Sequence, residues 1–252
     1  MADLPTFHPD TKLVDEVVQS PNYDQRRVDI IVLHSIGSAT MDEALRVLTR
    51  ERPSVSAHYL VGEDGRIVQL VPEAMRAWHA GPSVWAGFRD VNSRSIGIEI
   101  SRLNKIRRDA DFPAAQIEAV IALCRHVIAR HAIRPQRILA HSDIAPGRKQ
   151  DPGEDFPWDK LHAQGIGHWV APEPLGEEHG LALGDRGADV ASLQADLMRY
   201  GYEIAVTGSY DEPPRRVVEA FQRHFRPARV DGIADRSTVT TLRNLLASLA
   251  SL

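Results

Sequence analysis

The sequence lacks the features that mark several large protein classes. Cys124 is the only cysteine among the 252 residues, so the chain forms no internal disulfide. The chain has 30 basic and 34 acidic residues, a formal net charge of -4, so it shows no basic surplus of the kind that nucleic-acid-binding proteins carry. No apolar run approaches the roughly 18 residues that a transmembrane helix requires. We therefore expect neither a nucleic-acid partner nor a membrane span.

The N-terminal segment also lacks three features of secretory leaders: a basic start, an apolar run and a small-residue cleavage site. We expect no standard signal peptide there. The composition is otherwise ordinary, with 43% hydrophobic and 25% charged residues, which excludes disordered, collagen-like and fibrous chains. At this length, one large domain or two unequal domains are possible.

The first 170 residues alternate short β-rich runs with helical patterns, which predicts an α/β domain. Strands are expected over residues 30–33, 58–61, 66–71, 95–100 and 137–140, and helices over 41–50 and 114–131. Asp111 is expected to cap the longer helix, with Pro113 in its first turn.

A polar, Pro/Gly-rich stretch over residues 171–180 has no periodicity and is typical of a linker. After it, apolar residues recur at helical spacing in three stripes: Val190, Leu193, Leu197 and Met198; Val217, Val218, Phe221 and Phe225; and Val239, Leu242, Leu245, Leu246 and Leu249. This pattern predicts a small all-α domain of three helices over residues 181–252. No grouping of catalytic or metal-ligating side chains follows residue 170, so the tail is interpreted as a removable binding module.

Two of the eleven histidines stand out because each directly follows a short apolar strand. His34 and His141 should therefore project from strand ends, where open α/β sheets usually place ligands. Asp151 follows ten residues after His141 in a loop rich in Gly and Pro. Two imidazoles and one carboxylate suit Zn²⁺ and leave a fourth position for water, although such spacing also arises by chance. The other histidines, including His131, His168 and His224, are expected at surface, linker or capping positions.

Several short motifs occur in a fixed order along residues 28–165. They are Leu33-His34-Ser35, Trp78-His79-Ala80-Gly81, Asn92 followed by Ser95-Ile96-Gly97-Ile98-Glu99, His141-Ser142-Asp143, and Lys149-Gln150-Asp151-Pro152-Gly153. Together they resemble the N-acetylmuramoyl-L-alanine amidases of the type-2 amidase family, in particular its AmpD and AmiD branch. The tail resembles a different family, the type-1 peptidoglycan-binding domain, through Leu183-Gly184-Asp185-Arg186-Gly187, Gly201-Tyr202, Phe221-Gln222 and Asp231-Gly232-Ile233.

The resemblance implies a mixed central sheet flanked by helices, and a role for each matching residue. His34, His141 and Asp151 match the zinc ligands, and Glu99 and Lys149 match the residues that activate water and stabilise the transition state. Chemistry agrees with these roles, because a carboxylate can move a proton and a lysine can stabilise an oxyanion.

The resemblance also makes the segment around His79 a candidate wall of the substrate site. Trp78, His79, Asn92 and Arg94 are the candidate substrate-binding residues. Packing by Trp78, orientation of its own loop by His79, and surface roles for Asn92 and Arg94 are the alternatives. Tyr59 is expected to pack within its strand.

The expected function is zinc-dependent hydrolysis of the amide between the lactyl group of N-acetylmuramic acid and L-alanine, in peptidoglycan or muropeptides. The alternatives are a peptidoglycan recognition protein that binds without cutting, and a phage-type endolysin with the same chemistry. Residues 1–170 would form the catalytic domain, 171–180 the linker and 181–252 the peptidoglycan-binding domain. The start of the sequence suggests the cytoplasm, whereas the tail suggests the cell envelope. The sequence leaves open the oligomeric state and the preference for anhydro or reducing-end muramic acid.

Overall fold

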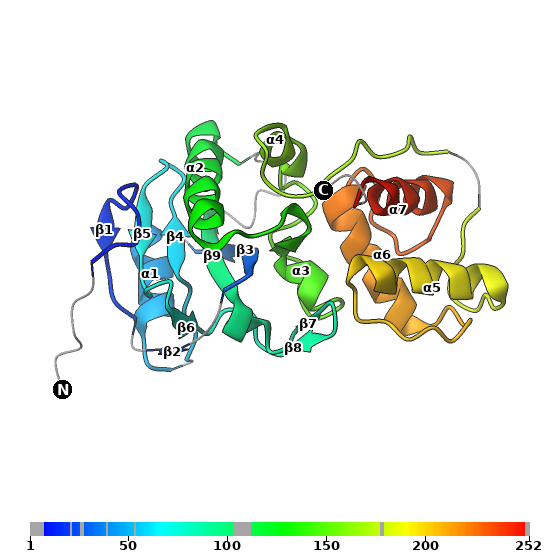
Figure 1. Cartoon of the computed structure of the whole chain (residues 1–252), viewed down its shortest axis with the longest axis horizontal. Helices are drawn as coiled ribbons and strands as arrows, with labels where there is room; N and C mark the ends of the chain where they lie inside the picture. Colours follow the sequence, from blue (N-terminus) through cyan, green and yellow to red (C-terminus); the bar gives the residue numbers. More distant parts are fainter. Residues whose placement is uncertain are drawn as a thin grey trace. The chain divides into compact units, whose positions relative to one another are not determined.

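The computed structural model of the chain describes residues 8–20, 22–25, 28–38, 40–52, 54–102, 112–176 and 179–249. The chain divides into two compact units, Met1–Gly81 with Asp90–Leu139, and Pro82–Arg89 with Ala140–Leu252. The first unit contains the large sheet, and the second contains the C-terminal helices (Figure 1). The division into residues 1–170, 171–180 and 181–252 stays a prediction.

A six-stranded sheet forms the centre of the first unit. Its strands in spatial order are β1 (Glu16–Val17), β5 (Ile67–Gln69), β4 (Tyr59–Val61), β9 (Ser95–Arg102), β3 (Ile30–Gly37) and β10 (Ile138–Ala140). The pairs β1/β5, β4/β9 and β9/β3 are parallel, whereas β4 and β5 are antiparallel. The expected mixed central sheet is therefore confirmed.

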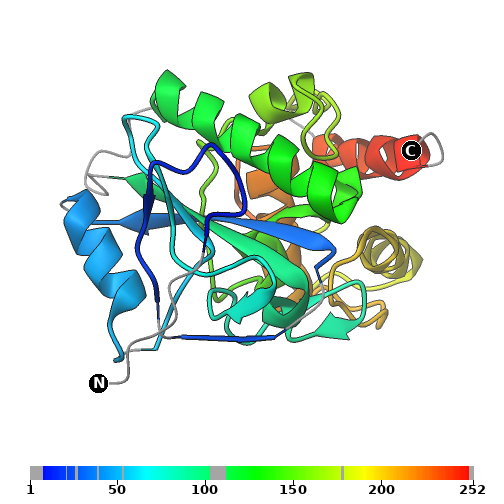
Figure 2. The ribbon, with the colours of Figure 1, turned by 60° about the vertical axis from the view of Figure 1, so that its left-hand side comes forward.

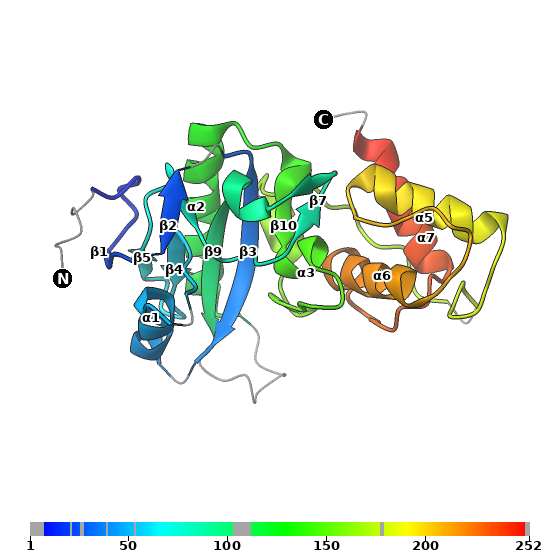
Figure 3. The same ribbon diagram turned by 90° about the horizontal axis from the view of Figure 1, so that it is seen from below.

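The two long strands β3 and β9 run side by side in the same direction (Figure 3). The apolar run at the start of β3 is completely buried, because Ile30, Ile31, Val32 and Leu33 are each 0% exposed. Such continuous apolar runs are typical of parallel strands that are covered on both faces.

One carboxylate connects the starts of three neighbouring strands. Asp29 directly precedes β3, and its Oδ1 accepts a hydrogen bond from Nε of Arg94, the residue before β9, at 3.0 Å. Its Oδ2 accepts from Nη1 of Arg137, the residue before β10, at 2.8 Å. The backbone N–H of Asp29 also donates to the carbonyl of Arg94 at 2.8 Å. We call Asp29, Arg94 and Arg137 the strand-start cluster.

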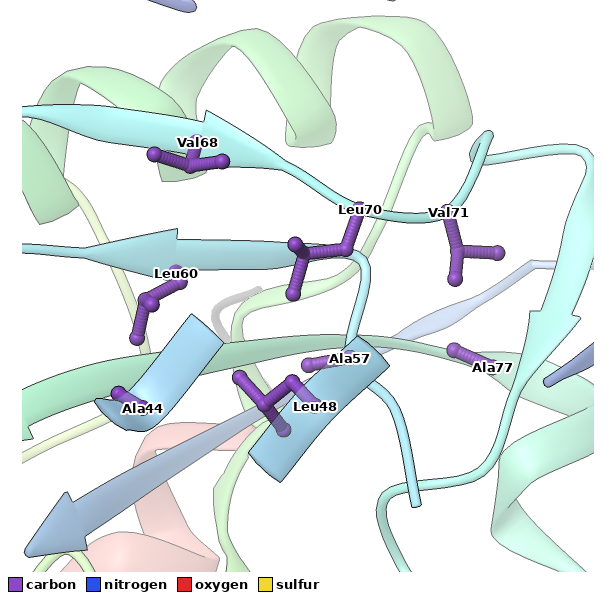
Figure 4. Close-up of a cluster of buried hydrophobic side chains, with 8 residues drawn as sticks. All are labelled: Ala44, Leu48, Ala57, Leu60, Val68, Leu70, Val71 and Ala77. Atoms are coloured by element: carbon purple, nitrogen blue, oxygen red, sulfur yellow. The ribbon is translucent and has the colours of Figure 1, made fainter. Parts of the chain in front are cut away.

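Two helices cover different sides of the sheet (Figure 2). From α1 (Met41–Thr49), Ala44 and Leu48 pack against Leu60 of β4 and Val68 of β5 in a buried apolar cluster (Figure 4). On α2 (Ala114–His131), the side-chain amide of Gln116 donates to the carbonyls of Val61 (3.1 Å) and Ser101 (2.8 Å). Helices therefore flank the sheet as expected.

The start of α2 differs from the expectation in one respect. Pro113 is the N-cap residue rather than part of the first turn, and it makes no side-chain capping bond. The expected cap, Asp111, lies outside the described residues.

Short elements complete the two units. They are β2 (Tyr23–Gln25), β6 (Met75–Ala77), η1 (Val91–Arg94) and η2 (Pro135–Arg137) in the first unit, and β7 (Val84–Trp85), β8 (Phe88–Arg89), α3 (His141–Ile144) and α4 (Trp158–Ala163) in the second. β2 pairs with β6, and β7 pairs with β8, both antiparallel.

The second unit also contains the three helices that the tail sequence predicts: α5 (Ala188–Tyr200), α6 (Glu212–Phe225) and α7 (Arg236–Ser248). Their apolar stripes form a core that includes Val190, Leu197, Val218, Phe221 and Leu245, each 0% exposed. Met198 was expected in the first stripe but is 50% exposed. Its side chain lies at the edge of the stripe, one residue beyond Leu197.

No helix of the described residues combines the length and the apolar character needed to cross a membrane.

Candidate functional site

Three neighbouring strands bring Leu60, Glu99 and His34 into one row. Glu99 of β9 lies opposite His34 of β3 on one side and opposite Leu60 of β4 on the other. Residues opposite one another on paired strands point to the same face, on strands about 5 Å apart. Leu60, at one end of this row, packs with Ala44 and Leu48 of α1. His34 is 1% exposed and Glu99 is half-buried.

Hydrogen bonds determine where His34 and His79 carry their protons. Ser95 Oγ lies 2.8 Å from the carbonyl of Val91, and it donates there because a carbonyl oxygen can only accept. Ser95 Oγ therefore accepts from Nε2 of His79 at 3.2 Å. Nδ1 of His79 then accepts from Nε2 of His34 at 2.9 Å. A neutral His34 thus carries its proton on Nε2 and presents the Nδ1 lone pair.

Asn92 and Gly97 hold His79 in this position. The amide oxygen of Asn92, a residue only 5% exposed, accepts from the backbone N–H groups of His79 (3.1 Å) and Ala80 (2.8 Å). A Cβ atom on Gly97 would lie 2.4 Å from Cγ of His79, so any larger residue would displace the imidazole. The contacts explain why glycine interrupts the otherwise bulky strand β9.

The other candidate substrate residues also contact the protein itself. Trp78 is half-buried, and its backbone N–H donates to Oγ of Ser56 at 2.9 Å. Arg94 binds Asp29 in the strand-start cluster, five residues before Glu99. Binding of substrate by Trp78, His79, Asn92 and Arg94 stays a prediction.

His141 and Asp151 lie at the two ends of one compact loop in the second unit. Nδ1 of His141 is 2.9 Å from Oδ2 of Asp151, and the backbone N–H of Ser142 donates to the carbonyl of Asp151 at 3.1 Å. His141 is 2% exposed. Lys149 is half-buried two residues before Asp151, and its backbone N–H donates to the carbonyl of Ala145 at 3.1 Å.

Among the described residues, His34, His141 and Asp151 are the group that could hold a metal ion. Each offers one ligand atom, and these atoms all lie within 4.8 Å of one another. β10 is the neighbour of β3 in the sheet, and His141 directly follows β10. Adjacent strands thus deliver the two histidines. His141 directly follows β10 as expected, whereas the expected strand-end position of His34 is wrong, because β3 stays paired with β9 for three residues beyond His34, to Gly37.

Tyr59 belongs to a separate polar cluster. Its hydroxyl donates to Oε1 of Glu73 at 2.7 Å, while Nε of Arg130 (2.9 Å) and Nε2 of His131 (2.7 Å) contact Oε2. Burial raises the pKa of Glu73, but the hydrogen bonds of His131, Arg130 and Tyr59 outweigh it and lower the pKa to about 2. Tyr59 packs within its strand as expected, whereas the surface or capping role expected of His131 is wrong.

Two further expectations about histidines are also wrong. His168 and His224 are 4% and 2% exposed, because aromatic rings of the second unit enclose them. Their sequence positions, near a linker and near a helix end, gave no indication of this burial. The sequence pattern predicts no role for Ser95 or Asp143, yet both make contacts next to candidate metal ligands.

Comparison with known families decides the assignment. Residues 24–154 match the family model for N-acetylmuramoyl-L-alanine amidase. The chain belongs to this amidase family. Residues 186–242 of the amidase match the model of a peptidoglycan-binding domain. The expected family, fold class and enzyme class are therefore confirmed.

Relatives of the amidase extend over both matched regions. N-acetylmuramoyl-L-alanine amidase AmiD of Escherichia coli K12 is 41% identical over 236 residues, 87% of this chain and 83% of AmiD. The solved complex of E. coli AmiD with anhydro-N-acetylmuramic acid-L-Ala-D-γ-Glu-L-Lys has a TM-score of 0.74 at 39% identity, covering 89% of this chain and 90% of that one. AmpDh3 of Pseudomonas aeruginosa, solved with an anhydromuramic pentapeptide, has a TM-score of 0.70 at 31% identity, covering 89% and 93%.

Proposed function

We propose that this amidase uses Zn²⁺ to hydrolyse the amide between the lactyl group of N-acetylmuramic acid and the L-alanine of peptidoglycan or muropeptides. The grouping of His34, His141 and Asp151, with ligand atoms within 4.8 Å, is the observation that carries the proposal. The family match and the ligand of the solved AmiD complex support the substrate class. We therefore select anhydromuropeptides as the soluble substrates for assays.

The donor set fits Zn²⁺ in type and number. Catalytic zinc sites commonly use three nitrogen or oxygen ligands from the protein and keep a fourth position for water. The Nε2–H of His34 donates a hydrogen bond to Nδ1 of His79. A histidine that binds a metal usually donates its other ring N–H to a neighbouring acceptor in this way. When bound, the ion lowers the pKa of a water molecule and polarises the scissile carbonyl.

Glu99 is the proposed general base and acid. Its carboxylate, half-buried beside His34, would accept a proton from the attacking water and return it to the leaving nitrogen of L-alanine. Lys149 would place its cation beside the developing oxyanion. His79 would keep His34 in one tautomer, and Trp78, Asn92 and Arg94 are the proposed substrate contacts.

A non-catalytic peptidoglycan recognition protein is the second candidate. Such relatives lose a metal ligand, whereas this chain retains His34, His141 and Asp151. A phage-type endolysin would share the chemistry of the leading proposal and differ only in its biological context.

The C-terminal domain is the proposed wall-binding module, with residues 1–170 as catalytic domain and 171–180 as linker. A hollow of about 430 Å³ between α5 and α7 has Asp189 and Asp196 on one helix and Arg236 and Arg243 on the other. Charges of both signs suit the amino and carboxylate groups of a stem peptide. Wall binding favours a location in the cell envelope, and fragment recycling in the cytoplasm is the alternative.

Mass spectrometry of reaction products tests the function directly. The amidase should release the stem peptide, with a free L-alanine amine, from a soluble anhydromuropeptide and from intact sacculi. A chelator, or the substitution His34→Ala, should abolish release, and zinc should restore activity only to the chelated wild-type enzyme. Full activity in a metal-free preparation would overturn the zinc assignment, and binding without cleavage would favour a recognition protein.

A further inference from the structure

Asp143 is a fully buried carboxylate two residues after His141. It is 0% exposed, and its Oδ2 accepts a hydrogen bond from the backbone N–H of Ala140 at 2.7 Å. Ala140 ends β10 and directly precedes His141, so this bond closes the turn that carries His141. A buried carboxylate is costly unless several donors surround it. One backbone N–H is not sufficient.

Two side chains from the C-terminal helices supply the remaining bonds. The hydroxyl of Tyr202, just after α5, donates to Oδ1 of Asp143 at 2.7 Å. Nδ1 of His224, on α6, donates to Oδ2 at 2.6 Å. Tyr202 and His224 are each 2% exposed, so water does not replace either donor. Both residues lie within 186–242, the stretch that matches the peptidoglycan-binding domain.

Aromatic packing fixes the direction of both donors. The imidazole of His224 is stacked between Trp158 of α4, at 3.7 Å between ring centroids, and its neighbour Phe225, at 3.8 Å. The ring of Tyr202 meets the ring of Trp85 edge-on at 5.0 Å. The two donors therefore reach Asp143 from rigid positions, and they cannot follow Asp143 if the turn moves.

We propose that Tyr202 and His224 are positioning residues of the amidase, which act through Asp143 to hold the turn that presents His141 to the metal. The inference rests on the function proposed above. It gives the peptidoglycan-binding domain a second task, because helices that recognise the wall also complete the support of a metal ligand. Hydrogen-bond partners behind metal ligands typically change metal affinity or activity by about 10–100-fold when they are removed.

Point variants of the full-length chain separate this role from general stability. Tyr202→Phe removes only the hydroxyl, and His224→Leu removes the donor to Asp143. His224→Asn returns an N–H donor near the position of Nδ1 and should rescue part of the loss. Tyr210→Phe is the matched control, because the buried Tyr210 hydroxyl bonds the carbonyl of Gly232 in the same domain without contacting Asp143.

Zinc affinity, measured by chelator competition, is the main readout. The kcat and KM on a soluble muropeptide and the rate of amide hydrogen exchange at Ala140 are measured as well. Tyr202→Phe and His224→Leu should weaken zinc binding about 10-fold or more, lower kcat more than they raise KM, and speed exchange at Ala140. Tyr210→Phe should lower the melting temperature without these effects. Unchanged zinc affinity in both Tyr202→Phe and His224→Leu would overturn this inference but leave the proposed function standing. A wild-type chain that binds no zinc would overturn the proposed function and the inference together.

Discussion

Removal of the C-terminal domain tests whether the amidase consists of independent modules. The sequence alone predicts that a chain ending at residue 175 stays folded and keeps normal activity on soluble muropeptides. The contacts within the second unit predict otherwise. Trp85 and Trp158, 2% and 4% exposed, pack against Tyr202 and His224, which the truncation removes.

The expected loss of stability is large for a chain of this size. Re-exposing most of two tryptophan side chains costs about 3–5 kcal/mol, and losing the two hydrogen bonds to Asp143 costs about 2 kcal/mol more. Typical domains have a total stability of about 5–15 kcal/mol. We therefore expect a truncated chain that is insoluble, or that melts about 10–20 °C below the full chain.

Differential scanning calorimetry and turnover of a soluble anhydromuropeptide are the assays. Residues 176–252 supplied as a separate polypeptide by co-expression should restore solubility and activity, because the same surfaces can reassemble. A truncated chain with an unchanged melting temperature and unchanged kcat/KM would refute the reasoning and support independent modules.

Three further substitutions probe the site and the fold. Glu99→Gln should keep bound zinc but lower kcat on the order of 100-fold, since the amide cannot take a proton; wild-type turnover would make Glu99 structural. Ser95→Ala should weaken zinc binding about 10-fold in calorimetric titrations, because the His34 tautomer is no longer fixed, whereas Ser101→Ala on the same strand should not. Equal zinc affinities of the Ser95→Ala and wild-type chains would exclude a role for the hydrogen bonds from Ser95 through His79 to His34. Burial, with the charges of His162 and His224, lowers the pKa of His168 from 6.5 to about 4. The unfolded chain therefore binds the extra proton, and the free energy of unfolding should fall by up to about 3 kcal/mol as the pH drops from 6.5 to 4; His168→Gln should flatten this slope in urea titrations.

Sequence reasoning predicted those parts of the fold and site that depend on local pattern. The buried run before His34 predicted β3, and the run before His141 predicted β10. His141 follows its strand as predicted, but β3 continues past His34 to Gly37, because pairing with β9 rather than the apolar run decides where the strand ends. The motif order located Glu99, whose register opposite His34 only the sheet topology reveals.

The missed features depend on contacts between distant segments. Asp143 and Tyr202 are 59 residues apart, and Asp143 and His224 are 81 apart, so no local pattern indicates that they meet. Periodicity likewise placed Met198 in the core stripe, although only the packing of the three helices decides which edge of a stripe is covered. His224 was expected near the surface because a helix end is usually exposed, whereas here two rings enclose it.

The strand-start cluster has a consequence for which insertions and deletions the protein can tolerate. From Asp29 to His34 the chain runs five residues, from Arg94 to Glu99 it also runs five, and from Arg137 to His141 it runs four. Each path spans about 13–17 Å of extended chain from a shared ion-pair cluster. A single added residue on any path would reverse which face its last side chain occupies. Length changes should therefore be disabling in the few residues after the cluster and better tolerated before it, except in the segment that contains His79 and Asn92. Scanning single-residue insertions would measure this difference.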